Sequence, residues 1–336
     1  MARFILKISI AAAILLQLTA CHSQEEFPND PHGNFDALWK EIDEHYCFFK
    51  YKNIDWNEVG ERYRAQIHPE MSSTELFDVC ASMLSELKDG HTNLISSFNV
   101  SRYWIWEQYP QNYDERLVNE FYLNFNYHQV SGIKYQILSN NFGYMYYGDF
   151  SSGIGEGNLD NILAYLASSD GLIIDVRDNG GGLLTSAEEL AARFTNEEIT
   201  VGYMQHKTGR GHNDFSSMEV QTLKPGRGLR WQKSVVVLTN RGVYSAANEF
   251  VKYMRCCPNT ITVGDRTGGG AGLPFSSELL NGWIVRFSAC PMYDAQGNST
   301  EFGIDPDCNI QLTESDRLSD RDTIIEFARQ LIRNKR

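Results

Sequence analysis

The chain has 336 residues, of which 42% are hydrophobic, and a formal net charge of -13 at pH 7. This length can bury one large core with a smaller one beside it, and the acidity argues against binding to nucleic acids or anionic lipid surfaces. Apart from Cys21, the cysteines show no metal-ligand spacing. Buried free thiols are therefore favoured, and no metal site is expected.

The first 20 residues have the pattern of a bacterial export signal. Arg3 and Lys7 precede an apolar run over Ile8–Leu16, and Leu18–Cys21 matches a lipobox whose cysteine is acylated after cleavage. The run is too short to be retained as a membrane span. An ordinary signal peptide or a buried helix is the alternative, but Cys21 favours a lipoprotein. We expect a lipid-anchored protein of the cell envelope, with the outer membrane favoured and the periplasmic or surface side left open.

Residues 27–95 carry apolar side chains at helical spacing and are expected to form an N-terminal helical subdomain. One amphipathic helix spans Phe35–Phe49, a second begins at Trp56, and Ser72–Glu75 has the capping pattern that precedes a third. A connecting segment over 96–134 follows.

His91 directly follows the stop of the third helix at Asp89-Gly90. A lone histidine in such a position is more often a surface or capping residue. Its place in a loop, in a chain with a suitable serine, makes it a candidate general base.

From Tyr135 to the end of the chain, strands alternate with helices, which indicates an α/β core over 135–336. Residues 206–230 are rich in Gly, Lys, Arg and Ser and are expected to form a long loop over the site. The expected strands are 135–138, 142–147, 172–176, 235–238, 261–263 and 283–287, and the expected helices are 159–167, 183–194, 246–254 and 323–332.

A glycine-rich loop follows the buried strand Leu172–Val176 and precedes a helix. Its backbone N–H groups can stabilise an anionic oxygen at the helix N-terminus. The run Gly180–Gly182 lacks the Lys-Ser/Thr ending of a phosphate loop and the spacing of a dinucleotide fingerprint. An oxyanion hole fits better.

Ser245 lies where the strand Val235–Leu238, after a turn at Thr239–Gly242, gives way to a helix that opens at Ala246. Backbone N–H groups at that junction have no helical acceptor. Considered alone, Ser245 is better interpreted as a helix N-cap. Together with His91 and the glycine loop, it is a candidate nucleophile.

Five short motifs carry a family resemblance that runs from about residue 35 to residue 310. They are Leu87–Thr92, Ile174–Gly182, Tyr244–Glu249, Val263–Gly270 and Gly303–Asp307. In this order they resemble the C-terminal processing peptidases, also called tail-specific proteases, and within them the branch similar to the tricorn protease core. The resemblance implies an α/β fold with a crotonase-like ββα core. A PDZ domain, which many members carry, is not expected because only about forty residues separate Thr92 from Lys134.

The departures from the family pattern concern the catalytic base. Gly270 stands where many members have the lysine of a Ser/Lys dyad. The tricorn-like branch resembles a Ser/His system instead, and His91 matches its histidine. Gly90 leaves no serine beside His91 for a relay. Glu301 best matches the acidic member of that branch, and a solvated carboxylate at a strand end is an equal alternative.

The leading prediction is an envelope-anchored serine peptidase that acts on peptides or unfolded proteins without a cofactor. Ser245 would attack the scissile carbonyl, His91 would take its proton, and the N–H of Ala246 with that of Gly181 or Gly182 would hold the oxyanion. The alternative is a non-catalytic binding module of the same fold that carries a hydrophobic or peptide ligand. The presence of both Ser245 and His91 favours the enzyme.

Overall fold

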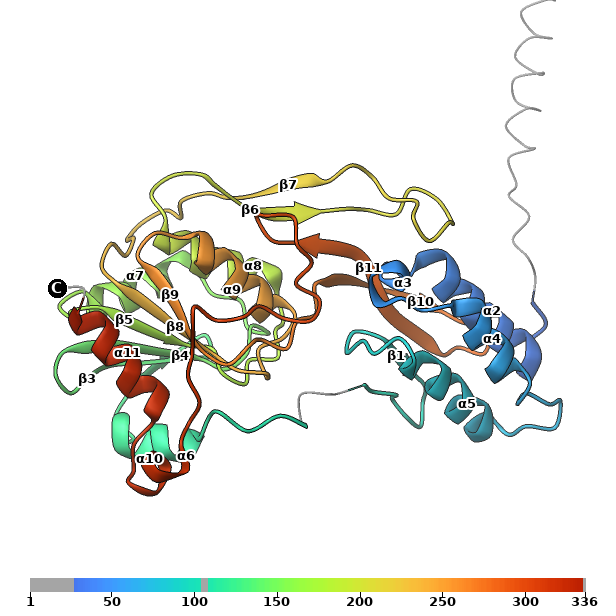
Figure 1. Cartoon of the computed structure of the whole chain (residues 1–336), viewed down its shortest axis with the longest axis horizontal. Coiled ribbons are helices and arrows are strands. Elements are labelled where there is room, and N and C mark those ends of the chain that lie inside the picture. Colours follow the sequence, from blue (N-terminus) through green and yellow to red (C-terminus); the bar gives the residue numbers. More distant parts are fainter. Residues whose placement is uncertain (1–26, 104–107, 335–336) are drawn as a thin grey trace, which may run out of the picture.

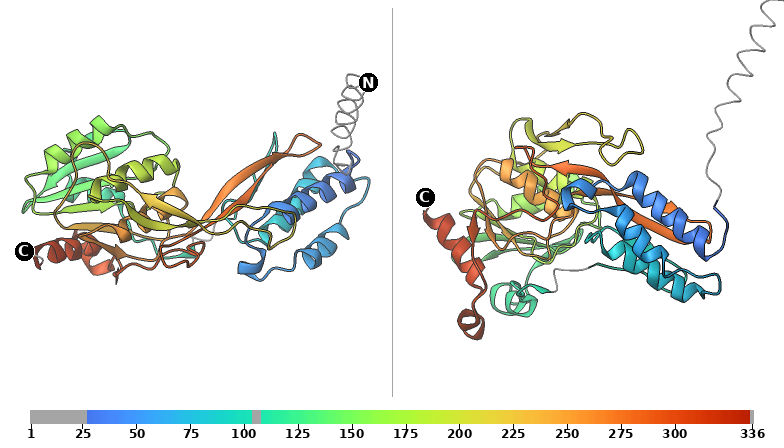
Figure 2. Two further views of the ribbon diagram at one scale, coloured as in Figure 1. Left: turned by 90° about the horizontal axis from the view of Figure 1, so that it is seen from above. Right: turned by 45° about the vertical axis from the view of Figure 1, so that its right-hand side comes forward.

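The computed structural model describes residues 27–103 and 108–334. The predicted signal peptide and its lipobox residue Cys21 lie outside the described residues. Within them, no helix is both long enough and apolar enough to cross a bilayer. The chain forms a helical lobe and an α/β lobe, and long strands join the two (Figures 1 and 2).

The helical lobe confirms the three predicted helices and adds a short one. The Asp30 side chain caps the first helix by accepting a hydrogen bond from Gly33 N at 2.8 Å. Ser72 and Glu75 form the predicted capping box. The apolar faces of these helices pack around Phe35 and Leu38, which are fully buried. The helices are α2 (Pro31–His45), α3 (Phe49–Lys52), α4 (Trp56–Arg64) and α5 (Ser73–Ser85).

The α/β lobe is built on a seven-stranded sheet with the order β12-β9-β8-β5-β4-β3-β2. Neighbours from β12 to β4 are parallel, whereas β4, β3 and β2 form an antiparallel meander. This is the α/β fold class predicted. The strands are β2 (His128–Val130), β3 (Ile133–Leu138), β4 (Phe142–Tyr147), β5 (Leu172–Asp175), β8 (Val235–Thr239), β9 (Thr260–Gly264) and β12 (Cys308–Asn309).

Both faces of this sheet are buried, which explains the continuous apolar runs of its central strands. Leu172 and Ile174 face one hydrophobic core, and Ile173 between them faces the other. One face is covered by α7 (Glu156–Leu166), α8 (Leu184–Ala191) and α9 (Ala246–Cys256), and the other by α6 (Glu115–Leu117), a π-helical turn (Val118–Tyr122) and α11 (Thr323–Asn334). The remaining helices are a 3₁₀ turn (Ala192–Phe194) and α10 (Glu314–Leu318).

A second sheet joins the two lobes. It has the order β1-β11-β6-β7, with β10 also paired to β11. One end of β11 pairs with β1 and buries Val285 and Phe287 in the helical core, while its other end pairs with β6. The strands are β1 (Asn93–Ile95), β6 (Ile199–Met204), β7 (Glu219–Leu223), β10 (Gly272–Glu278) and β11 (Ile284–Tyr293).

The expectation of a loop over 206–230 is wrong at β7, which pairs antiparallel with β6. The segment between them reaches the helical lobe. His212 Nε2 lies 2.7 Å from Asp43 Oδ1, and its ring stacks on Phe49 at a centroid distance of 4.3 Å. None of these residues lines the cavity at Ser245 described below.

Candidate active site

Two loops meet because β5 and β8 are adjacent parallel strands, with Asp175 opposite Leu238 at their carboxyl ends. Carboxyl ends of neighbouring parallel strands are where α/β folds commonly place ligands. A backbone hydrogen bond from Tyr244 N to Asn179 O, 3.0 Å long, joins the loop after β8 to the loop after β5. The glycine run and the candidate nucleophile are thereby brought side by side.

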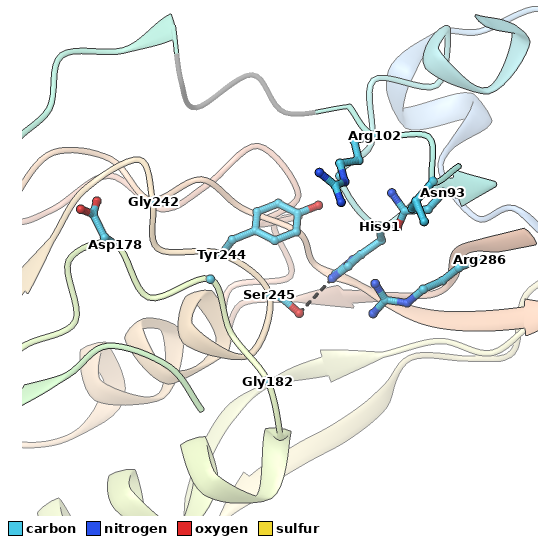
Figure 3. A pocket seen from close by; sticks show the side chains of 12 residues that line it. His91, Asn93, Arg102, Asp178, Gly182, Gly242, Tyr244, Ser245 and Arg286 are labelled. Atoms are coloured by element: carbon cyan, nitrogen blue, oxygen red, sulfur yellow. Dashed lines mark hydrogen bonds between the residues drawn. The ribbon is translucent and has the colours of Figure 1, made fainter. Parts of the chain in front are cut away.

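Ser245 has φ 56° and ψ -124°, a backbone conformation that non-glycine residues seldom adopt. A hydrogen bond from Ser245 N to Gly269 O at 2.9 Å holds this turn. The side chain does not cap α9, so the N-cap interpretation does not describe this serine. Ser245 Oγ instead lies 2.9 Å from His91 Nε2 (Figure 3).

His91 is 3% exposed, so it is neither a surface residue nor a solvated one. Its backbone N donates to Asp89 Oδ1 at 2.8 Å, and Tyr46 Oη donates to Asp89 Oδ2 at 2.9 Å. These bonds fix the loop that follows α5. Burial lowers the pKa of His91 to about 4, although the Asp89 carboxylate opposes this shift. The ring is therefore neutral at pH 7, as a proton acceptor must be.

The other ring nitrogen, His91 Nδ1, is buried and makes no hydrogen bond of ordinary geometry with the described residues. Besides the Asp89 carboxylate, the backbone of Gly272, the first residue of β10, raises the pKa of His91. In this structure, therefore, no carboxylate orients the imidazole through Nδ1.

Two of the three backbone N–H groups considered for an oxyanion hole are available. Gly181 N donates to Asn179 Oδ1 at 2.9 Å, so that N–H is already used. In the described part of the chain, the N–H groups of Gly182 and Ala246 donate to no other group. Gly182 lines the same cavity as Ser245, and Ala246 is the first residue of α9. The geometry favours Gly182 with Ala246.

Glu301 is 4% exposed, so it is not a solvated carboxylate at a strand end. Its Oε1 lies 2.8 Å from Lys52 Nζ, and its Oε2 accepts a hydrogen bond from Ala271 N at 2.9 Å. Both oxygens are held by groups other than His91. Burial and the neighbouring Asp89 raise the pKa of Glu301 to about 7, against the effect of Lys52.

Lys52 also lies 3.5 Å from Asp89 Oδ2 and is 3% exposed at its side chain. Burial acts to raise the pKa of Asp89, but Lys52 and His91 outweigh it and the pKa is lowered. One lysine is thus shared by two buried carboxylates, one of which also holds the His91 loop. Burial would lower the pKa of Lys52, but these carboxylates raise it.

The Tyr244 ring separates His91 from the glycine run at 268–270. Its centroid lies 4.9 Å from that of His91. Gly270 has φ +81°, and a Cβ added there would lie 2.5 Å from the Tyr244 ring. The position that aligns with the family's lysine is therefore filled by a neighbouring aromatic ring.

A cavity of about 550 Å³ opens above Ser245. Figure 3 shows Arg286 and Asn93 beside His91, with Asp178 on the opposite side of Ser245. The described residues contain no group of three or more His, Cys, Asp or Glu side chains arranged to hold a metal ion. The cysteines from Cys47 to Cys308 are free thiols.

Comparison with known proteins identifies the family of this chain. The model of peptidase family S41 matches residues 141–310, which is half of the chain and includes Ser245 and Glu301. The chain belongs to peptidase family S41. The model of the tricorn protease C1 domain matches residues 27–85, which form most of the helical lobe. The family predicted from the five motifs is confirmed, and it places this S41 chain among serine-type peptidases.

Individual relatives agree with this assignment. A solved structure of a candidate peptidase from Parabacteroides merdae is 51% identical, with 91% of this chain and 97% of that chain covered and a TM-score of 0.86. Tricorn protease of Thermoplasma acidophilum is 27% identical over 48% of this chain and 14% of its own length. Carboxy-terminal processing protease CtpA of Bacillus subtilis is 26% identical over 44% of this chain and 30% of its own length. The S41 chain thus matches less than a third of either curated relative.

Sequence reasoning did not identify Lys52 and Arg286 at this site. Lys52 stands in the short helix Phe49–Lys52, where nothing local distinguishes a buried lysine from a surface one. Arg286 lies within a predicted strand, but its side of that strand depends on pairing with Asn93, far away in the sequence. Both positions follow from tertiary contacts.

Proposed function

We propose that this chain hydrolyses peptide bonds with Ser245 as nucleophile and His91 as general base. The observation that carries this proposal is the 2.9 Å contact between Ser245 Oγ and a neutral His91 Nε2, at a serine held in a strained turn between a strand and a helix. Membership of family S41 supports it.

The reaction follows from the positions of these groups. Ser245 Oγ attacks the scissile carbonyl carbon while its proton passes to His91 Nε2. The N–H groups of Gly182 and Ala246 stabilise the negative oxygen that forms, and each such donor contributes on the order of 10²-fold to 10³-fold in rate. His91 then gives the proton to the leaving amine, and water releases the acyl group by the reverse sequence.

Glu301 has a positioning role in this proposal. Its contact with Ala271 N holds the segment that follows the glycine run, and its contact with Lys52 ties that segment to the helical lobe. It is not a proton carrier for His91, since its two oxygens are bound elsewhere.

A fluorophosphonate probe tests the nucleophile. Such a probe modifies Ser245 in the parent protein, and Ser245→Ala abolishes the label without changing the thermal midpoint. Ser186→Ala, at a buried hydroxyl of α8, is the control that keeps the label. Labelling that survives in Ser245→Ala would move the nucleophile elsewhere. A folded parent that takes no label and cleaves no peptide would favour the non-catalytic binding module.

We also propose that the mature chain begins at Cys21 and is held in the cell envelope by a lipid on that cysteine. The lipobox Leu18–Cys21 after a short apolar run supports this. In bacterial cells, metabolic labelling with a palmitate analogue is expected to mark the parent, and Cys21→Ser should abolish the label. An unlabelled parent recovered in soluble form would contradict the anchor.

A further inference from the structure

Arg286 of β11 is a cation in the active-site cavity that the proposed hydrolysis does not use. Its side chain is half-buried, and among the described residues no carboxylate forms an ion pair with its guanidinium. It lies near enough to His91 that its charge lowers the pKa of that imidazole. A partly desolvated guanidinium without an anionic partner therefore faces the reacting atoms.

The backbone holds Arg286 in place from both sides. It pairs with Asn93 of β1 and with Ser276 of β10, and its neighbours Val285 and Phe287 are fully buried. Pairing on both sides of β11 fixes the backbone from which the Arg286 side chain extends. The backbone of Arg286 is thus fixed beside the cavity before any substrate arrives.

The position of Arg286 relative to His91 indicates which part of a substrate it meets. In a serine peptidase the base that accepts the serine proton later gives it to the leaving amine, so the leaving segment must pass His91. Figure 3 shows Arg286 on the His91 side of Ser245, whereas Asp178 lies on the opposite side. Arg286 therefore faces substrate atoms on the C-terminal side of the scissile bond.

We propose that Arg286 binds a carboxylate on the leaving-group side of the peptide substrate, an inference that rests on the proposed peptidase function. The planar guanidinium matches a carboxylate through two parallel hydrogen bonds. Two sources offer this group: the α-carboxylate of a short C-terminal fragment, and the side chain of an Asp or Glu just after the cleaved bond. Asp178 repels the same charge on the acyl side, so the cavity distinguishes the two directions of a bound peptide.

Four matched peptide sets distinguish these sources. One degenerate peptide mixture is synthesised in two forms, one ending in a carboxylate and the other in a carboxamide. Each form is made twice, once with Asp and Glu present and once with Asn and Gln in their place. Cleavage rates and cut positions are measured by mass spectrometry for the parent, Arg286→Gln and Arg286→Lys. Arg62→Gln is the control, because it removes an equal charge from an exposed ion pair of the helical lobe.

The parent and the control are expected to prefer one carboxylate-bearing set by about 10- to 100-fold, the range for hydrogen bonds to a charged group. Arg286→Gln should bring that ratio close to one, mainly through KM, and Arg286→Lys should keep part of it. A lower cleavage rate for the carboxamide peptides identifies the chain terminus as the source of the carboxylate. A lower rate for the peptides with Asn and Gln identifies an acidic side chain. If an acidic side chain is the source, Arg286→Glu should prefer Lys at the same position.

Two further outcomes separate this inference from the proposed function. Cleavage of all four sets at equal rates would overturn the inference and leave the peptidase function intact. Absence of any cleavage would overturn the peptidase function. In that case, binding of the four peptide sets to immobilised Ser245→Ala, with and without Arg286→Gln, tests the inference. Equal retention of all sets overturns it. Retention that depends on both Arg286 and a carboxylate supports it.

Discussion

The His91 imidazole is buried, and its pKa of about 4 sets the pH range over which it can act as a base. The neutral ring accepts a proton and the charged ring does not. We therefore expect kcat/KM to rise with pH through about 4 and to be flat from pH 6 to 7, and His91→Ala to remove most activity. Initial rates over pH 3.5–8 measure this, with circular dichroism to exclude unfolding. A rise in kcat/KM between pH 6 and 7, where an exposed histidine titrates, would contradict this prediction.

The same shift has a consequence for stability. The folded state binds the His91 proton only near pH 4, whereas the unfolded chain binds it near the ordinary value of 6.5. The unfolded state therefore holds more protons between these values, and the free energy of unfolding contributed by His91 falls as the pH falls through this window. Urea titrations of the parent and of His91→Gln at several pH values isolate this contribution. An equal pH dependence in both proteins would rule it out.

The loop after β5 is shaped by close contact with the nucleophile. A Cβ on Gly181, at φ +99°, would lie 2.7 Å from Tyr244 O and 2.8 Å from the Ser245 Cβ. Gly181→Ala should lower the free energy of unfolding by about 1–3 kcal/mol and reduce kcat at least tenfold by displacing Ser245. Gly180→Ala is the matched control, since a Cβ there meets nothing within 4 Å. Equal effects of the two substitutions on kcat would refute the contact argument.

Elements were predictable where burial leaves a local signature. The strands β5 and β8 are apolar throughout because both faces of their sheet are covered, and α5 carries its own capping box. The strand β7 has no such signature: most of Glu219–Leu223 is exposed, and backbone pairing with β6 holds it. The sequence therefore predicted only part of β11 in the second sheet, at 283–287, and did not predict β7. Ser245 and His91 were found because each stands at an element boundary, whereas nothing local identifies Lys52.

At the scale of the whole molecule, the proposed catalytic pair is divided between the lobes. His91 follows α5 of the helical lobe, and Ser245 precedes α9 of the α/β lobe. The buried ion pair of Lys52 and Glu301 crosses the same boundary at 2.8 Å. The relative position of the lobes therefore determines whether the Ser245–His91 distance is kept.

Removal of that lysine should affect both stability and activity. Lys52→Met leaves two buried carboxylates without their cation. Such a change typically lowers the free energy of unfolding by about 3–5 kcal/mol. This loss of stability should be larger at pH 8 than at pH 5.5. The pKa of Glu301 is raised to about 7 in the parent, so the Glu301 carboxyl is neutral at the lower pH. Urea titrations at both pH values test this, together with the kcat of the folded variant.

Lys134→Met is the control for Lys52→Met, since it breaks a pair with an exposed Glu115. Lys134→Met should lower the free energy of unfolding by only about 0–1 kcal/mol. If the two variants unfolded alike, or if Lys52→Met kept full kcat, the ion pair would not be what maintains the arrangement of the lobes.

The aromatic ring of Tyr244 leaves no room in this chain for a side chain at position 270. It packs against His91 and occupies the space where a side chain on Gly270 would begin. A lysine introduced at Gly270 could not reach the nucleophile unless Tyr244 first became small, and a small residue there would leave the imidazole unsupported. Exchange of the base at this site therefore requires changes at more than one position, because a side chain at position 270 and the ring of Tyr244 cannot occupy the same space.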